Sequence, residues 1–192
     1  MAKLYFRYST MGAGKSLDLL KTAYNYEERN KKIQLFTSDL DNRFGVRKIT
    51  SRVGLDRDAH GFHNTTDLFE IIRALCNDCD CILIDEAQFL TKEQVWQLTD
   101  VVDELGYTVI AYGIRSDYMG EPFEGSTHLF TLADKVEELK TICEFGDKAT
   151  MNMRCVDGVP VFKGEQVSIG GNESYIPVCR KYFKKQRKEF DK

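Results

Sequence analysis

Along the first part of the chain, the spacing of apolar residues alternates between the periods of strands and helices. Lys3–Tyr8 alternates polar and apolar residues and predicts a strand, and Ile33–Thr37 predicts a second, shorter one. Cys79–Ile84 and Tyr107–Tyr112 are nearly continuous apolar runs. Such runs are typical of parallel strands that are buried on both faces, because every side chain then meets the core.

Helical periods lie between these strands. The first helix, which follows a turn of small residues, is predicted to bury one face made of Leu19, Leu20, Ala23 and Tyr24. Asp67–Leu75 predicts a second helix, and Thr91 with Gln94 forms a capping-box pattern that opens a third helix through Leu105. Strands that alternate with helices to about residue 135 predict an α/β domain with a parallel sheet.

Two segments depart from this alternation. Asp39–Ser51 is polar and has no clear period, so we expect a mobile loop there. From about residue 141 the segments shorten and turn signals multiply, which predicts a nucleotide-binding domain at 1–140 and a smaller lobe at 141–192. The basic stretch Lys184–Lys188 is interpreted as a solvated helix end.

Composition narrows the class of protein. With 192 residues, 42% of them hydrophobic, and a net charge of -3, the chain fits a globular protein with one substantial core. The acidic balance argues against a nucleic-acid partner. There is no apolar run long enough to cross a bilayer, and the N-terminus lacks the layout of a signal peptide, so we expect a cytoplasmic protein whose mature chain starts at Met1. Six cysteines are then expected to be reduced thiols or metal ligands.

The stretch Ser9–Ser16 carries the most specific chemistry. It matches the phosphate-binding pattern G-x-x-x-x-G-K-[ST], with Ser9 in place of the first glycine, and it lies between a predicted strand and a predicted helix. Backbone N–H groups around Gly12 and Gly14 can close on phosphates, while Lys15 holds the β- and γ-phosphates and Ser16 ligates Mg²⁺. The candidate ATP residues of this loop are Ser9, Met11, Gly12, Ala13, Gly14, Lys15 and Ser16.

Two carboxylates follow the third predicted strand. Asp85 lies at its carboxyl end, where ligands gather in nucleotide-binding α/β sheets, and is expected to act on Mg²⁺ directly or through water. Glu86 can take the proton of an acceptor hydroxyl as general base. We assign Gln88 of the same box to the ATP and Mg²⁺ group. The box also resembles that of helicases, but one α/β domain with an acidic balance does not suit a helicase.

Five segments, in order along nearly the whole chain, resemble the type II thymidine kinase family, which joins a P-loop domain to a small zinc-bearing lobe. They are Ser9–Ser16, Tyr26–Arg29 with Asp41–Gly45, Asp85–Phe89, Tyr112–Tyr118 with Gly120–Phe123, and Ile169–Tyr175. The resemblance implies a RecA-like parallel sheet with flanking helices and a zinc-ribbon-like C-terminal lobe whose loop closes over the substrate. It also implies transfer of the γ-phosphoryl group of ATP to the 5′-hydroxyl of thymidine, and of deoxyuridine, with Glu86 as the catalytic base.

The same resemblance implies a thymidine pocket. Its implied residues are Met11, Phe89, Ile114, Tyr118 and Phe123, together with Ser168, Ile169, Gly170, Gly171 and Tyr175 from a late loop at about Gly164–Tyr175. Aromatic faces of this kind favour stacking on a planar base. The resemblance further implies a homotetramer.

The chain departs from the family in the small lobe, where zinc has four Cys or His ligands. Cys143 and Cys179 match two of them, but Phe145 and Tyr182 stand where the other ligands are expected. Two thiolates make a poor zinc site, so we expect no structural zinc unless Cys155 and another residue substitute.

Some alternatives stay open at this point. A regulatory ATPase without a nucleoside acceptor would keep the phosphate loop and Asp85, and an inactive relative would bind substrates without transfer. Either Arg43 or Arg115 could supply a cation near the transferring group. Cys76, Cys79 and Cys81 are expected to be inert thiols, and His60, His63 and His128 receive no role.

Overall fold

The computed structural model describes residues 1–40, 47–167 and 173–192. Its strands are β1 (Leu4–Ser9), β2 (Ile33–Ser38), β3 (Lys48–Thr50), β4 (Asp56–Asp58), β5 (His60–Phe62), β6 (Cys81–Ile84), β7 (Thr108–Ile114), β8 (Lys135–Glu138), β9 (Met151–Val156), β10 (Val159–Val161) and β11 (Glu173–Val178). Its helices are α1 (Lys15–Glu27), α2 (Leu68–Leu75), α3 (Lys92–Asp103), α4 (Glu124–Leu132) and α5 (Arg180–Phe190), with a 3-10 turn, η1, at Ala87–Phe89.

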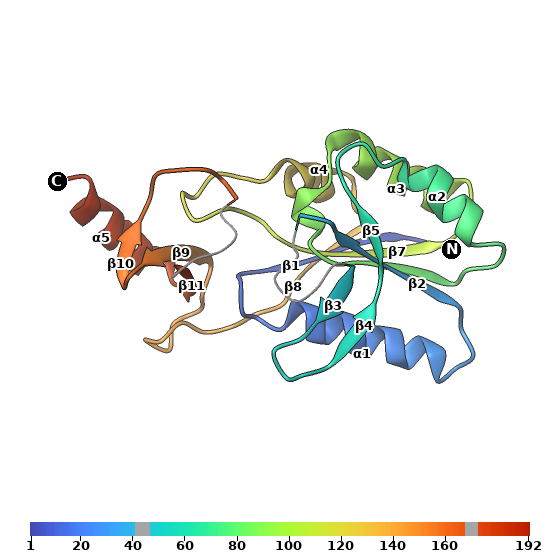
Figure 1. Ribbon diagram of the computed structural model, residues 1–192, viewed down its shortest axis with the longest axis horizontal. Coiled ribbons are helices and arrows are strands. Elements are labelled where there is room, and N and C mark those ends of the chain that lie inside the picture. The colour runs from blue at the N-terminus through green and yellow to red at the C-terminus, as the bar shows by residue number, and fades with distance from the viewer. Residues whose placement is uncertain (41–46, 168–172) are drawn as a thin grey trace.

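The main sheet has six parallel strands in the order β5-β2-β6-β7-β1-β8. Helix α1 and the β3–β4 hairpin lie on one face, and α2, α3 and α4 cover the other (Figure 1). The predicted α/β fold with a parallel sheet and flanking helices is confirmed. Because all strands run the same way, the carboxyl ends of β1, β6 and β7 lie at one edge of the sheet.

Burial on both faces explains the continuous apolar run of β6. Its residues alternate between two cores: Ile82 and Ile84 join the core formed with α2 and α3, while Cys81 and Leu83 join the core formed with α1. All four side chains are fully buried. A polar residue at any of these positions would lose its water on one face or the other, which is why the strand shows no period of two.

The predicted start of α3 is confirmed. Thr91 Oγ1 accepts a hydrogen bond from the backbone N–H of Gln94 at 3.2 Å, and Gln94 Oε1 accepts one from the N–H of Thr91 at 3.0 Å. This reciprocal pair satisfies two donors that the first helical turn leaves without partners. Asp67 caps α2 in a similar way, since its carboxylate accepts from Glu70 N at 3.0 Å.

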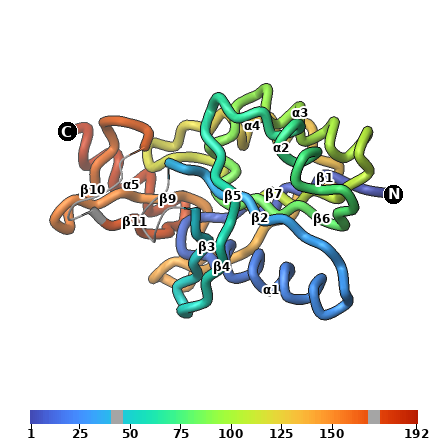
Figure 2. The backbone as a smooth tube through the Cα atoms, turned by 45° about the vertical axis from the view of Figure 1, so that its right-hand side comes forward, coloured from blue at the N-terminus to red at the C-terminus, as the bar shows by residue number. Residues whose placement is uncertain are grey.

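A smaller lobe lies beyond the carboxyl ends of the main sheet (Figures 1 and 2). It contains an antiparallel sheet in the order β10-β9-β11, and α5 packs against β9 and β10. Its core consists of Met153, Cys155, Phe162, Val178 and Phe183. The predicted division at residues 140 and 141 falls between the last strand of the main sheet and the first strand of the lobe, and it stays a prediction.

The expectation of a loop over Asp39–Ser51 is wrong for its last part. β3 lies within it and pairs with β4, and Ile49 is buried against the core on the α1 side. A strand of three residues has no readable period, so tertiary burial alone reveals it. Residues 41–46 lie outside the described residues. In the described part of the chain there is no helix both long and apolar enough to span a membrane.

Candidate active site at the phosphate loop

The phosphate loop joins β1 to α1 and depends on two glycines in the left-handed region. Gly12 has φ 74° and Gly14, which caps α1, has φ 81°. L-residues pay about 1–2 kcal/mol in this region, so glycine is the residue that fits. Ser9, by contrast, is the last residue of β1 and pairs with Ile114 in regular strand register. The first glycine of the motif is therefore replaced at a position where no left-handed backbone is needed.

The side chains of the loop's last two residues face the end of β6. Lys15 is buried, and its Nζ donates to the carbonyl of Thr10 at 2.8 Å. Ser16 Oγ donates to Asp85 Oδ2 at 2.8 Å. A hydroxyl and a carboxylate side by side are the oxygen donors that Mg²⁺ prefers, with phosphates and waters completing its shell. These residues therefore fit a Mg–nucleotide site.

Glu86 is held in an unusual conformation. Its φ of 54° lies in the left-handed region, and its N–H donates to Asp85 Oδ1 at 3.0 Å. Gln88 Nε2 donates to Glu86 Oε2 at 2.5 Å, while Gln88 Oε1 accepts from Ile114 N at 3.2 Å. A non-glycine residue with positive φ costs energy and persists only where its surroundings demand it. Gln88 thus ties the Glu86 carboxylate to the end of β7.

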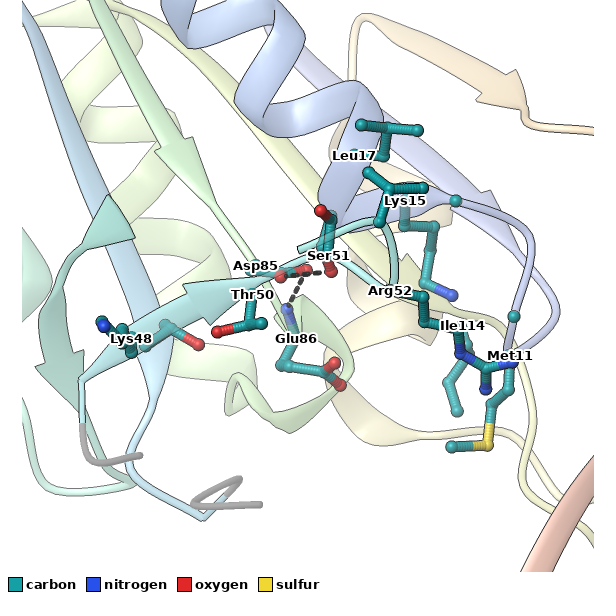
Figure 3. Close-up of a pocket in the computed structure, with 15 residues that line it drawn as sticks. Met11, Lys15, Leu17, Lys48, Thr50, Ser51, Arg52, Asp85, Glu86 and Ile114 are labelled. Carbon is teal, nitrogen blue, oxygen red and sulfur yellow. Dashed lines mark hydrogen bonds between the residues drawn. The ribbon is translucent and has the colours of Figure 1, made fainter. Parts of the chain in front are cut away.

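These groups line one cavity of about 280 Å³. Its lining residues are Met11, Gly12, Gly14, Lys15, Ser16, Leu17, Thr37, Lys48, Thr50, Ser51, Arg52, Val53, Asp85, Glu86 and Ile114. Figure 3 shows the Glu86 carboxylate pointing away from Asp85, toward the side of the cavity where Met11 and Ile114 lie. Lys15, Ser16 and Asp85 therefore share one cavity with Glu86, whose carboxylate faces the apolar side chains of Met11 and Ile114.

Arg52 is a site residue that the sequence did not reveal. A Cβ built on Gly12 would lie 3.3 Å from Arg52 Nη1, so the guanidinium rests against the phosphate loop. Of the two arginines considered from the sequence, Arg43 lies outside the described residues. Arg115 donates from Nη2 to the carbonyl of Thr150 at 2.8 Å and lines a different groove. The only sequence signal for Arg52 was a basic residue in a polar stretch, and β3 brings it to the loop.

Comparison with known proteins agrees with this geometry. The sequence model of the family described as thymidine kinase matches residues 2–183. The chain belongs to the thymidine kinase family. It is 52% identical over 184 residues to a thymidine kinase of Lactiplantibacillus plantarum, covering 95% of this chain and 96% of the relative. It is also 52% identical over 187 residues to one of Vibrio cholerae, covering 96% and 97%, and 50% identical over 184 residues to one of Lactococcus lactis, covering 95% and 97%.

The residues that the family resemblance assigns to thymidine fall into three groups. Met11 and Ile114 line the cavity. Phe89 and Phe123 form an edge-to-face pair with ring centroids 5.8 Å apart, and the rings of Tyr118 and Tyr175 lie 6.3 Å apart. Neither aromatic pair lines the cavity in its described extent. Ser168, Ile169, Gly170 and Gly171 lie outside the described residues, so their thymidine contacts stay predictions.

Three residues assigned to ATP and Mg²⁺ do not line the cavity as described. Gln88 is buried and bridges Glu86 to Ile114, so its side chain holds the Glu86 carboxylate in place. The Ser9 hydroxyl donates to the carbonyl of Leu139, away from the loop's concave side. The side chain of Ala13 is absent from the lining described above. These placements follow from sheet packing, which the motif pattern does not encode.

Asn152 links the lobe to the phosphate loop. Its Oδ1 accepts from Met11 N at 2.7 Å, and its Nδ2 donates to the carbonyl of Ser116 at 3.1 Å. The side chain is buried, so both hydrogen bonds are shielded from water. Polar groups buried in this way are costly to leave without partners. The lobe therefore fixes the position of Met11, and no pattern in the sequence indicates this contact.

The family's zinc does not fit this lobe. Burial raises the pKa of the Cys143 thiol, but N–H groups of Phe145, Cys179 and Asp147 bring it below its ordinary value, which favours the thiolate form that a metal ligand needs at this one residue. Phe145 and Tyr182 contact each other with centroids 4.7 Å apart. In the described residues there is no group of three or more His, Cys, Asp or Glu side chains that could hold a metal ion. Two sulfurs and a ring pair do not make the four-ligand set that zinc requires.

The remaining cysteines behave as inert thiols. Cys76, Cys79 and Cys81 are free and buried. Burial raises the pKa of the Cys76 and Cys81 thiols to about 12. Since the thiolate is the nucleophile and metal ligand, these groups stay protonated and unreactive at neutral pH. Cys155 is part of the lobe core, so it does not complete a metal site.

Proposed function

We propose that this chain transfers the γ-phosphoryl group of ATP to the 5′-hydroxyl of thymidine. The observation that carries the proposal is the position of Glu86 in one cavity with Lys15, Ser16 and Asp85, facing Met11 and Ile114. A phosphate-binding end beside an apolar end suits a nucleotide donor next to a nucleoside acceptor. The thymidine kinase relatives support the identity of the acceptor.

The roles of the residues follow from their chemistry. Glu86 accepts the proton of the acceptor hydroxyl as that oxygen attacks the γ-phosphorus. Lys15 and the loop N–H groups hold the phosphates in line with the acceptor, and this positioning carries most of the catalysis in phosphoryl transfer. Ser16 and Asp85 would hold Mg²⁺, which when bound neutralises charge on the phosphates.

Arg52 supplies a further cation. Its guanidinium lies against Gly12, where phosphates bound by the loop would be within its reach. A planar guanidinium donates several hydrogen bonds to phosphate oxygens and stays charged at any physiological pH. Arg52 therefore stabilises the charge that spreads over the transferring group, the role for which Arg43 and Arg115 were considered from the sequence.

The test is transfer from γ-labelled ATP to a panel of deoxynucleosides with Mg²⁺. Labelled monophosphate from thymidine, less from deoxyuridine and none from deoxycytidine or purines supports the proposal. Deoxyuridine differs by one methyl group, which an apolar slot distinguishes by about 1–3 kcal/mol. ATP hydrolysis that no nucleoside changes would instead indicate a regulatory ATPase. The implied tetramer is a separate prediction, and sedimentation of the purified protein measures it.

A further inference from the structure

A second cavity, separate from the active site, lies between α5 and the end of β7. It is a groove of about 770 Å³. Its lining residues are Arg115, Thr150, Arg180, Lys181, Lys184, Lys185 and Lys188. All of these except Thr150 are cations, and none is a carboxylate. The chain as a whole carries a net charge of -3, so this cluster of positive charges is a local feature of the surface.

The orientation of α5 produces the cationic wall. Phe183 is buried and packs edge-to-face on Phe162, and Arg187 Nη1 donates to the carbonyl of Met119 at 3.0 Å. These contacts hold the helix against the lobe by one side. Four lysines at 181, 184, 185 and 188 follow the spacing i, i+3, i+4 and i+7, so they share another side of the helix. That side faces the groove.

The charges of α5 that line the groove have no partner among the described residues. Within residues 1–40, 47–167 and 173–192, no side-chain hydrogen bond or ion pair involves Arg180 or the four lysines, which are exposed. Elsewhere in the chain, Lys31, Lys32 and Lys148 each meet a carboxylate. Like charges three and four residues apart on a helix repel one another. An anion in the groove would relieve this repulsion, which is worth about 0.2–0.5 kcal/mol for each such pair.

The opposite wall adds a fixed cation. Arg115 follows β7, and its hydrogen bond to the carbonyl of Thr150 holds the guanidinium there. An anion in the groove would thus meet positive charge from two sides. The stripe from Lys181 to Lys188 covers about 10 Å at 1.5 Å per residue, which is longer than one phosphate group. The lining contains no aromatic side chain on which a base could stack.

We propose that this groove binds a linear oligophosphate through its phosphate chain alone. The chain could come from free inorganic polyphosphate or from the triphosphate of a nucleotide, since the two share the same chemistry. The proposal does not depend on the kinase activity, because no groove residue lines the active-site cavity. Binding should weaken steeply with salt, as expected for exposed charges.

The experiment titrates inorganic tripolyphosphate into the full chain by calorimetry at low salt. Variant K184E/K188E reverses two groove charges, and the control K3E/K92E makes the same change in net charge at lysines outside the groove. Besides any binding at the phosphate loop, we expect a saturable groove site whose affinity falls by about tenfold or more in K184E/K188E and is unchanged in the control. The milder K184Q/K188Q should show a smaller loss, and circular dichroism checks that α5 stays folded in each variant. Kinase turnover without tripolyphosphate should equal that of the parent chain.

Two further arms identify the source and can overturn the proposal. If ATP binds the parent chain with two equivalents and K184E/K188E with one, the groove binds nucleotides. If ATP binds the parent chain and every variant with one equivalent, the groove binds free polyphosphate. Equal tripolyphosphate binding in K184E/K188E and K3E/K92E would refute the groove. Tighter binding of a single-stranded oligodeoxythymidylate than of tripolyphosphate would also refute it, because the surface would then recognise nucleic acid.

Discussion

Replacing Glu86 by Gln tests the proposed base with little change in shape. The variant keeps an oxygen that can accept from Gln88 Nε2, a contact of 2.5 Å in the parent chain. Glu and Gln have the same backbone preferences, so the left-handed turn at φ 54° carries the same strain in both. Lys15, Ser16 and Asp85 are untouched. The substitution therefore removes the proton acceptor and leaves the phosphate end of the cavity as it was.

The expected loss is large and confined to turnover. A general base contributes about 10²–10⁴-fold in rate, which is about 2.7–5.5 kcal/mol of barrier. We expect kcat for thymidine phosphorylation to fall by this factor in the Glu86→Gln variant. The affinity for ADP with Mg²⁺, measured by calorimetry, should stay within about twofold, and the free energy of unfolding within about 0.5 kcal/mol.

A second substitution separates catalysis from folding. Glu86→Gly also removes the base but relieves the left-handed backbone, worth about 1–2 kcal/mol, against a glycine entropy cost of about 0.5–1 kcal/mol. This variant should be as slow as Glu86→Gln. Because it also leaves the buried Gln88 Nε2 without its Glu86 acceptor, at a cost of about 1–3 kcal/mol, its free energy of unfolding in urea should stay within about 3 kcal/mol of that of the parent chain. If Glu86→Gln retained kcat within about fivefold of the parent, Glu86 would not be the base. If ADP affinity collapsed together with kcat, the residue would instead hold the turn.

Substitutions at four other positions test the active site, the packing of α4 and the small lobe. Arg52→Ala should lower kcat by about 10²–10³-fold and change the affinity for ADP far less, and Arg52→Lys should recover part of the rate. Equal kcat values in the parent chain and both variants would show that Arg52 takes no part in the mechanism. Gly125→Ala would place a Cβ 2.6 Å from the carbonyl of Ala87, so urea unfolding should show a loss of about 1–3 kcal/mol, and an unchanged midpoint would contradict the close packing of α4 on η1. A double-mutant cycle with Phe145→Ala and Tyr182→Ala should give a coupling energy of about 0.5–1.5 kcal/mol in the free energy of unfolding. Elemental analysis of the purified protein should find no zinc. One zinc per chain would contradict the view that this ring pair takes the place of the metal.

Local chemistry made the phosphate end of the site predictable. Lys15 and Ser16 lie within one short loop, and Asp85 and Glu86 directly follow a buried strand. In a parallel sheet the carboxyl ends of neighbouring strands share an edge, so the two segments were expected to meet. The contact of 2.8 Å between Ser16 and Asp85 agrees with that expectation. The pattern of apolar residues likewise predicted the four central strands of the main sheet, because strands buried on both faces carry mostly apolar side chains. It did not predict the edge strands β5 and β8, which are short and carry polar side chains.

The sequence by itself thus determined the four central strands of the sheet, the helices α1, α2 and α3, the phosphate loop and the acidic pair, since each is a pattern of contiguous residues. Tertiary structure alone decided which distant side chains complete the site. Arg52 reaches the loop only because β3 packs against α1. Gln88 Nε2 meets the Glu86 carboxylate because the backbone N–H of Ile114 holds the oxygen of the same amide. The four lysines of α5 face one groove only because Phe183 fixes the helix rotation. Distances across a sheet and the rotation of a helix arise from the packing of many residues, so no local pattern records them.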